Sequence, residues 1–428
     1  MGYVCSFLCL FIFLFSYIRH NKIYHPVTSF SLLFFVVTFM SSLRLYNFYT
    51  APDIAYIIIS CGVLFFSIGS ILVENKRFVV GKNVHEKKYD FNKCMYYILL
   101  SICLLIVFPR FVIILSYLLK GNTIGDIYVI LAASTIEEEE LALSGLQNIL
   151  MQFIGYPILY TLVPTSIVLF FNTYEKKFII IAFILGIIRV LLDSRRTYLI
   201  SFFLFLFIAF LHYKEKLLLN KKYHNLVKKI KKYIPLLLIA IILIFTFISR
   251  SRSNTVGQKY SSLGSFYNYY AGCVQYLGYC IQNYRFEHSY GFTTFRGLFS
   301  PIFGMLKIFG IEPIHPYQVA TEIVNGMKYV VFYVAPNSRF NSFTTCFYQF
   351  YCDGGYIGII FLSIIFGMFS QILYTKFIYD NQLRFDVKYL YYYGTILLLS
   401  FTNMLTVLAF VVWPLLIERL LYKKINKE

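Results

Sequence analysis

Charged side chains are scarce in this sequence. Asp, Glu, Lys and Arg together make up 14 % of its 428 residues, whereas hydrophobic residues make up 59 % and aromatic residues 20 %. The chain repeats apolar runs of roughly 17 to 25 residues, and each run is long enough to cross a bilayer. This composition predicts an all-α polytopic membrane protein that forms one integral membrane domain over residues 1–428.

Several catalytic motifs are also absent. The sequence has no Walker lysine loop and no GxGxxG, HExxH, GxSxG or DxD motif, so nucleotide hydrolysis, dinucleotide chemistry, zinc proteolysis and metal-dependent transfer from nucleotide sugars lack support. The nine cysteines form no CxxC pair of the kind found in zinc and redox sites. We therefore expect no cofactor and no metal, and any reaction must draw its energy from the substrate itself.

The apolar runs predict eleven membrane spans. The first run has no basic residue before it and Arg19, His20 and Lys22 after it, which is not the charge pattern of a cleavable signal peptide. We expect it to be a retained span that starts outside. The predicted spans cover residues 2–18, 27–42, 54–74, 94–119, 148–172, 178–193, 198–213, 233–249, 354–375, 389–403 and 405–421.

Basic residues indicate the orientation, because short cytoplasmic connections carry an excess of Lys and Arg. With the C-terminal tail placed inside, the inner segments carry 25 of the Lys and Arg residues and the outer connections carry 12. This distribution predicts an odd number of spans, with the N-terminus outside and the C-terminus cytoplasmic. The inner basic run 214–233 is amphipathic, and we expect it to lie on the inner leaflet rather than to bind nucleic acid.

The arginines are distributed differently from the lysines. Of the 25 lysines, 21 lie in inner segments, whereas 8 of the 14 arginines lie in outer segments, where positive charge opposes insertion. A guanidinium fork suits two oxygens of a phosphate or carboxylate, so these arginines indicate an anionic ligand at the outer face. Arg195 and Arg196, on a very short hairpin, either anchor to headgroups or form a phosphate clamp. Arg189, within a span, either marks a site or pairs with Asp193.

One outer segment, residues 250–353, is too long and too polar to be only a connection, and it is predicted to hold the active site. Helical spacing of apolar residues predicts an amphipathic helix over 262–283, whose tyrosines suit either the membrane interface or stacking on sugar rings. The apolar piece 298–311 is too short to span, and we expect it to dip into the membrane and line a lipid entrance. Cysteines in this large loop could form a disulfide, whose pairing the sequence leaves open.

The order of these features resembles the oligosaccharide repeat-unit polymerases of bacterial O-antigen and capsule synthesis, the Wzy type. The matching pieces are SRRT after the sixth span, SRSRSN after the eighth, GFTTFRGLFSPI in the large loop and NSFTTCFYQFYCDGGYIG before the next span. The chain departs from a pattern of some members, in which a Gly follows an outer Arg by eleven residues. The resemblance covers nearly the whole chain in layout and about forty residues in motif.

This resemblance implies a metal-independent glycosyltransferase of the bacterial cytoplasmic (inner) membrane. It would move a growing glycan as a block from undecaprenyl pyrophosphate onto a sugar hydroxyl of a new lipid-linked repeat unit. The implied partners are undecaprenyl-pyrophosphate-linked oligosaccharides, membrane lipids and a chain-length-regulating co-polymerase, and nucleic acid is not among them.

Such a reaction needs cations for the donor. Arg250, Arg252 and Arg296, with Arg195 or Arg196, are predicted to hold the pyrophosphate, because arginines can neutralise the charge that develops on the leaving group. Arg339 and Asn341 belong to a polar cluster that we expect to bind the glycan or to fix the loop.

The acceptor hydroxyl needs a proton acceptor. The outer segments offer Glu287, His288, His315, Glu322 and Asp353, of which His315, His288 and Asp353 are the candidate catalytic residues. Asp353 begins a Gly-rich turn into a span, so capping of a helix is the alternative role for its carboxylate.

Two other functions fit the same layout. The related ligase would transfer a finished glycan onto lipid A core or another acceptor, and it shares the layout and the use of arginine. A flippase would move lipid-linked repeat units across the bilayer. Transporters usually show internal repeats, and this sequence has no clear repeat and concentrates its charges at one face.

Overall fold

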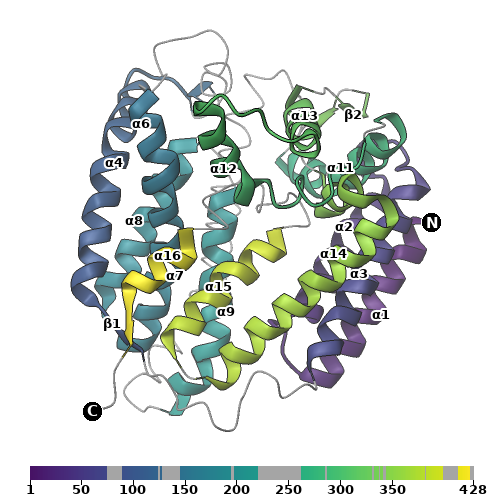
Figure 1. The fold of residues 1–428 in the computed structure, drawn as a ribbon. Coiled ribbons are helices and arrows are strands. Elements are labelled where there is room, and N and C mark those ends of the chain that lie inside the picture. Colours follow the sequence, from purple (N-terminus) through teal and green to yellow (C-terminus); the bar gives the residue numbers. More distant parts are fainter. Residues whose placement is uncertain are drawn as a thin grey trace. The chain divides into compact units, whose positions relative to one another are not determined.

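The computed structural model describes residues 1–74, 89–123, 126–127, 145–193, 197–219, 262–284, 287–329, 332–336, 338–340, 344–380, 382–398 and 413–424. These residues are almost entirely helical, so the predicted all-α class is confirmed (Figure 1). The chain folds as two compact units, of which unit 1 comprises Met1–Asp90 and Phe266–Glu428 and unit 2 comprises Phe91–Ser265.

Unit 1 contains most of the elements. Its helices are α1 (Gly2–His20), α2 (Pro26–Leu43), α3 (Asp53–Glu74), α11 (Ser262–Asn283, whose first four residues fall in unit 2), α12 (Arg296–Ile308), α13 (His315–Tyr329), α14 (Cys346–Tyr379), α15 (Leu383–Leu398) and α16 (Trp413–Leu421). A short 3-10 turn covers Leu45–Asn47. Strands β2 (Phe332–Ala335) and β3 (Ser338–Phe340) form an antiparallel hairpin, and β1 (Tyr89–Phe91) pairs with β4 (Tyr422–Lys424).

Unit 2 is built around one buried helix. Its elements are α4 (Lys93–Leu119), α6 (Gly145–Leu150), the π-helical turn η4 (Met151–Gly155), α7 (Tyr156–Thr173), α8 (Lys176–Asp193) and α9 (Thr197–Leu219). Every residue of α7 from Tyr156 to Phe171 is buried, and α4, α8 and α9 pack around it. A helix that is apolar all round is expected to occupy such a central position.

Six helices among the described residues are long and apolar enough to cross a membrane. They are α1, α2, α3, α4, the continuous stretch Met151–Thr173, and α14, while Tyr198–Lys214 is a shorter apolar helix. Ten of the eleven predicted ranges overlap a described helix, and the range 233–249 lies outside the described residues. The membrane character of the chain is thus supported, and the count of eleven stays a prediction.

The core of unit 1 is the group α1, α2, α3 and α14, which lie side by side (Figure 1). Two glycines allow α3 and α14 to touch backbone to backbone. A Cβ added at Gly69 would lie 2.2 Å from the carbonyl oxygen of Ile364, and one added at Gly367 would lie 2.0 Å from that of Phe66. Small residues at helix crossings are the usual device by which membrane helices approach closely.

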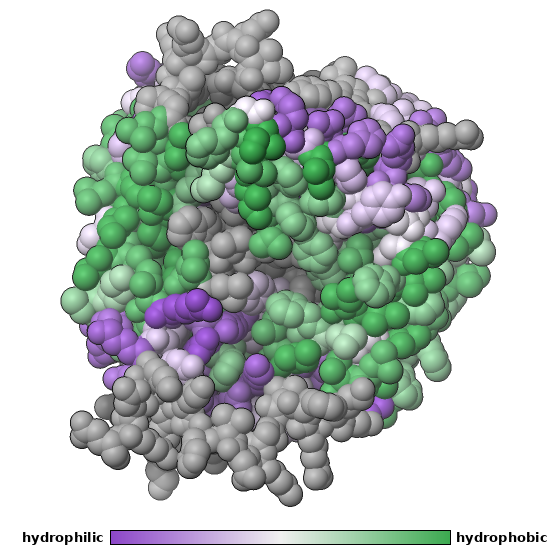
Figure 2. Space-filling view, in the orientation of Figure 1, coloured by the Kyte–Doolittle hydropathy of each residue, from purple (hydrophilic) through white to green (hydrophobic). Residues whose placement is uncertain are grey.

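The outward flank of α14 carries an apolar stripe. Ile357, Phe361, Ile365 and Phe369 follow one another at four-residue spacing and are all exposed. Figure 2 shows this flank in the hydrophobic colour, whereas hydrophilic residues gather at the end of unit 1 that carries α13. The stripe is the surface expected of a helix that faces lipid.

Helix α11 has the bounds that the sequence predicts. Tyr267 is 4 % exposed and Tyr276 is fully buried, so protein covers these two rings, and an interfacial position of the helix stays a prediction. The end of α2 and the connection after it contact this helix: Tyr267 donates a hydrogen bond to the carbonyl of Met40 in α2, and Gln275 donates one to the carbonyl of Tyr49 in the connection, each at 2.5 Å. The periodicity predicted the helix correctly, and the partner of its apolar face is protein.

Candidate functional site

The candidate site is built on a break in α14. Gly354 has φ −169° and Gly355 has φ 59° and ψ −141°, a backbone conformation that is essentially restricted to glycine. The segment before the break folds against the segment after it, because a Cβ added at Gly358 would lie 2.3 Å from the Phe350 carbonyl oxygen. The predicted span 354–375 begins at this break. The prediction therefore located the turn correctly but did not include the eight helical residues that precede it, from Cys346 to Asp353.

The break gives a loop two backbone acceptors. The carbonyl of Cys352 accepts a hydrogen bond from the Ser289 amide at 3.1 Å, and the carbonyl of Asp353 accepts one from the Tyr290 amide at 3.0 Å. In an unbroken helix these carbonyls would bond to amides four residues further along the same helix. The break therefore binds the loop before α12 to the start of the long spanning segment.

The side chain of Asp353 holds the same loop. Its Oδ1 accepts hydrogen bonds from Ser289 Oγ at 2.5 Å and from the Thr293 amide at 2.9 Å, and its Oδ2 accepts one from the Thr294 amide at 2.9 Å. The residue is 4 % exposed. A buried carboxylate is expected to be stable when several donors surround it, so this arrangement caps the turn 291–295. The alternative role that the sequence analysis gave Asp353, capping, is therefore supported. The carboxylate caps the neighbouring loop rather than its own helix.

Glu287 and His315 form an exposed pair beside this loop. His315 Nε2 lies 2.7 Å from Glu287 Oε2, and the two side chains are 67 % and 74 % exposed. His315 is the first residue of α13, and Glu287 immediately precedes His288. An imidazole oriented by a carboxylate is the usual form of a histidine general base, because the carboxylate stabilises the imidazolium.

His288 connects the pair to the break. A Cβ added at Gly355 would lie 3.4 Å from His288 Cε1 and 3.6 Å from Nε2, so the ring lies against the glycine turn. The structure therefore brings His288, His315 and Asp353 into one region of unit 1, although they are spread over residues 288–353. Whether one of them acts as a base stays a prediction.

Arg296 is the one residue of the predicted pyrophosphate clamp whose side chain the structure describes. It begins α12, three residues after Thr293, and its Nε is buried without a hydrogen-bond partner among the described residues. Arg339 lies in β3 opposite Tyr333, and its side chain is outside the described part. Arg195, Arg196, Arg250, Arg252 and Asn341 also lie outside the described residues.

Helix α12 has one packed face and one exposed apolar face. On the packed face, Phe303 meets Tyr317 of α13 with ring centroids 4.3 Å apart. On the other face, Leu298, Ile302 and Met305 are 39 %, 52 % and 63 % exposed. The expected apolar piece is therefore a helix with a free hydrophobic side, next to the candidate site.

Arg189, in unit 2, is enclosed by tyrosines. Its guanidinium carbon lies 3.9 Å, 4.5 Å and 4.0 Å from the ring centroids of Tyr156, Tyr160 and Tyr198. It also donates a hydrogen bond to Tyr198 Oη at 2.7 Å and another to Tyr160 Oη. Cation–π contacts of this kind stabilise a guanidinium away from water. The side chain of Asp193, the expected partner, lies outside the described part.

Three residues of the site were missed as functional candidates, namely Ser289, Thr293 and Thr294. Both threonines belong to the GFTTF piece of the resemblance, but nothing local indicates that they face an acid about sixty positions away. The four cysteines of the large loop, Cys273, Cys280, Cys346 and Cys352, are buried free thiols, and the disulfide that the sequence left open is not formed. Across the described ranges, no group of three or more His, Cys, Asp and Glu side chains could hold a metal ion.

Comparison with known proteins adds no further constraint, since no family model, no curated protein and no solved structure matches this chain.

Proposed function

We propose that this protein is a membrane glycosyltransferase that polymerises lipid-linked oligosaccharide repeat units on the outer face of the bacterial cytoplasmic membrane. The observation that carries the proposal is the exposed Glu287–His315 pair beside a loop that Asp353 holds to a membrane helix. It supplies a proton acceptor at one end of a group of apolar helices, where a lipid-linked substrate can be reached from the bilayer.

In this proposal His315 is the general base. Its Nε2 is bonded to Glu287, so its Nδ1 takes the proton from the acceptor sugar hydroxyl. The hydroxyl oxygen forms the new glycosidic bond to the anomeric carbon of the donor, and the bond from that carbon to the pyrophosphate breaks. Undecaprenyl pyrophosphate leaves with the electron pair, and Glu287 stabilises the imidazolium.

Arg296 is the described residue best placed to bind the leaving group. Its position at the start of α12 adds the positive end of the helix to its own charge. A charge-assisted contact to a phosphate oxygen contributes about 1.5 to 3 kcal/mol. The other arginines of the clamp are Arg195 or Arg196, Arg250 and Arg252, and Arg339 with Asn341 would contact the glycan.

The exposed face of α12 would serve the lipid tails. Leu298, Ile302 and Met305 give an apolar surface directly after Arg296, so a polyprenyl chain could lie against the helix while its pyrophosphate meets the arginine. A chain-length-regulating co-polymerase is a further partner that the resemblance implies.

The test is genetic. The gene is deleted in its own host, variants are returned on a plasmid, and the length ladder of the surface polysaccharide is compared on a gel. Glu287→Gln and His315→Ala should lower the rate of glycan transfer by about a hundredfold or more. The ladder should therefore shorten towards one repeat unit. The matched control is Glu312→Gln, which removes another exposed carboxylate of the same loop.

Each outcome assigns or removes a function. A deletion that leaves single repeat units on the normal acceptor supports polymerisation. Long chains left on the lipid carrier would mean a ligase, and repeat units trapped on the inner leaflet would mean a flippase. An unchanged glycan in the deletion strain, or a full ladder in both Glu287→Gln and His315→Ala, would overturn the proposal.

A further inference from the structure

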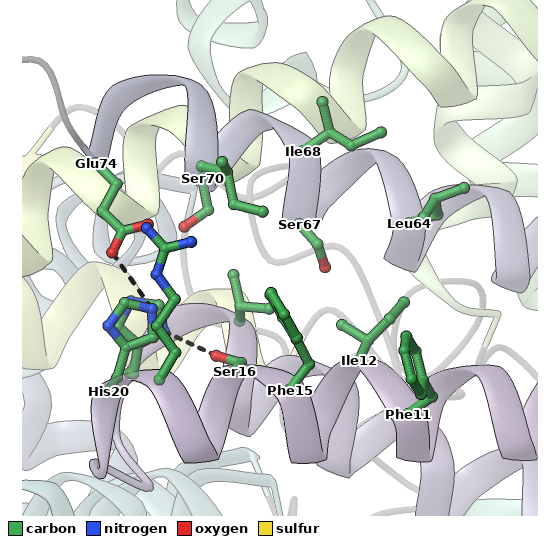
Figure 3. A pocket seen from close by; sticks show the side chains of 14 residues that line it. Phe11, Ile12, Phe15, Ser16, His20, Leu64, Ser67, Ile68, Ser70 and Glu74 are labelled. Atoms are coloured by element: carbon green, nitrogen blue, oxygen red, sulfur yellow. Dashed lines mark hydrogen bonds and ion pairs between the residues drawn. The ribbon is translucent and has the colours of Figure 1, made fainter.

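A cavity of about 170 Å³ lies between α1 and α3 of unit 1. Figure 3 shows its two walls, with Phe11, Ile12 and Phe15 on one helix and Leu64 and Ile68 on the other. An apolar cavity of similar volume, about 150 Å³, binds benzene or xenon, so this space is large enough for several methylene groups of a hydrocarbon chain.

The length of the cavity walls matches the depth of one leaflet. At 1.5 Å per residue, the wall from Phe11 to Arg19 is about 12 Å long and the wall from Leu64 to Glu74 is about 15 Å long. Half of a hydrocarbon core that is about 30 Å thick is about 15 Å. An acyl chain with its headgroup at the charged end would therefore extend to the middle of the bilayer.

The charged end carries one cation and one anion side by side. Arg19 Nη2 lies 3.0 Å from Glu74 Oε2, and His20 Nε2 lies 3.4 Å from Glu74 Oε1. The Arg19 side chain is 38 % exposed, so further guanidinium donors can reach a ligand. A neutral pair of opposite charges complements a headgroup that joins a phosphate to an ammonium, whereas an anionic headgroup would meet the repulsion of Glu74.

A buried histidine is the second observation that indicates a ligand. His25 lines the same cavity, is 1 % exposed, and stacks on His20 with ring centroids 3.7 Å apart. The Nδ1 atom of His25 lies 3.3 Å from Ser16 Oγ. Its Nε2 atom makes no well-formed hydrogen bond within the described residues, although the side chain of Gln371 lies beside the ring. Buried polar atoms normally have a partner, so a polar group entering the cavity would satisfy this nitrogen.

We propose that this cavity binds one acyl chain of a zwitterionic phospholipid, with the phosphate on Arg19 and the ammonium on Glu74. The site is separate from the candidate glycan site. Gln371, which accepts a hydrogen bond from Ser70 beside the cavity, lies about 24 Å along α14 from Gly355, at the break beside Asp353. The lipid site therefore does not depend on the proposed function.

The test is lipid retention by the purified full-length protein, measured by native mass spectrometry. Dioleoyl phosphatidylethanolamine and dioleoyl phosphatidylglycerol are added in equal amounts, so that only the headgroups differ. Ile68→Trp fills the cavity, and Ile57→Trp is the matched control on the same helix, because Ile68 is 37 % and Ile57 is 40 % exposed.

We expect the wild type to retain phosphatidylethanolamine about tenfold more strongly than phosphatidylglycerol, Ile68→Trp to lose that retention, and Ile57→Trp to keep it. Glu74→Gln should keep binding lipid while losing the preference for phosphatidylethanolamine. Equal retention of the two lipids by the wild type would mean ordinary annular lipid and would overturn the proposal. If Ile68→Trp does not fold, Glu74→Gln decides, since an unchanged preference there also overturns it. Glu287→Gln should bind lipid normally, which separates this result from the glycan assay.

Discussion

At the scale of single residues, Asp353 and His25 are two of the buried titratable side chains of unit 1, and different surroundings stabilise them. Asp353 is surrounded by three hydrogen-bond donors, and its carboxylate is compensated in place. His25 has fewer partners, and burial, with the positive charges of His20 and Arg19, lowers its pKa to about 3. It is therefore neutral in the folded protein at physiological pH.

This burial makes the folded protein sensitive to mild acid. In the unfolded chain His25 has a pKa near 6.5, so below that pH the unfolded state takes up a proton that the folded state does not, and stability falls until the pH nears 3. Between pH 7 and pH 5 the loss should be about 2 kcal/mol. Denaturant titration in detergent at the two pH values would measure it, and His25→Gln should lose correspondingly less. An equal loss in both proteins would show that other groups cause the effect.

The sequence could select candidate catalytic residues but not their partners. His288, His315 and Asp353 were chosen because they lie in a polar outer loop and can accept a proton. That His315 meets Glu287, or that Asp353 meets Thr293, depends on how α13 and α14 pack, and no local pattern records it. Tertiary contacts of this kind decide whether a carboxylate is free to react or serves as a cap.

At the scale of elements, the break in α14 organises the candidate site. The sequence correctly placed a turn at the Gly-Gly pair and the start of a span after it. It did not reveal the helical segment from Cys346 to Asp353, because that segment is rich in aromatic residues that bury against α2 and α3 and shows no solvent-facing period. It also did not predict the β2–β3 hairpin, whose strands are only four and three residues long.

The two glycines of the break should differ in their tolerance of alanine. Gly355 has φ 59° and ψ −141°, so Gly355→Ala should cost about 1 to 3 kcal/mol and weaken the attachment of the loop 289–294. Gly354 has an extended φ and open space around its Cβ position, so Gly354→Ala is the control and should change stability little. Unfolding in detergent and the polysaccharide ladder would both report the difference. Equal effects of the two substitutions would show that the strained turn does not hold the site.

At the scale of the whole molecule, the long apolar runs predicted most of the helices. Ranges such as 54–74 and 94–119 differ from α3 and α4 by one residue at one end, because a membrane span is defined by its own composition. The division into two compact units was not visible, since it depends on which helices pack together. The last predicted spans, 389–403 and 405–421, are described only in part, by α15 and α16.

The orientation across the membrane rests on the asymmetry of basic residues and can be tested with single cysteines. Tyr290, in the loop beside Asp353, is 75 % exposed, and Tyr379, at the end of α14, is 68 % exposed, so either position should react when the reagent can reach it. Tyr290→Cys and Tyr379→Cys are made in a Cys94→Ser background, because Cys94 is an exposed native cysteine.

A maleimide that cannot cross the cytoplasmic membrane should label Tyr290→Cys in intact cells and Tyr379→Cys only after that membrane is opened. The short connection after α14 carries basic residues that resist translocation, whereas the loop around Tyr290 has to be outside if it meets a substrate presented there. Labelling of Tyr379→Cys in intact cells would reverse the orientation. It would place the Glu287–His315 pair in the cytoplasm, where the proposed glycan transfer could not take place.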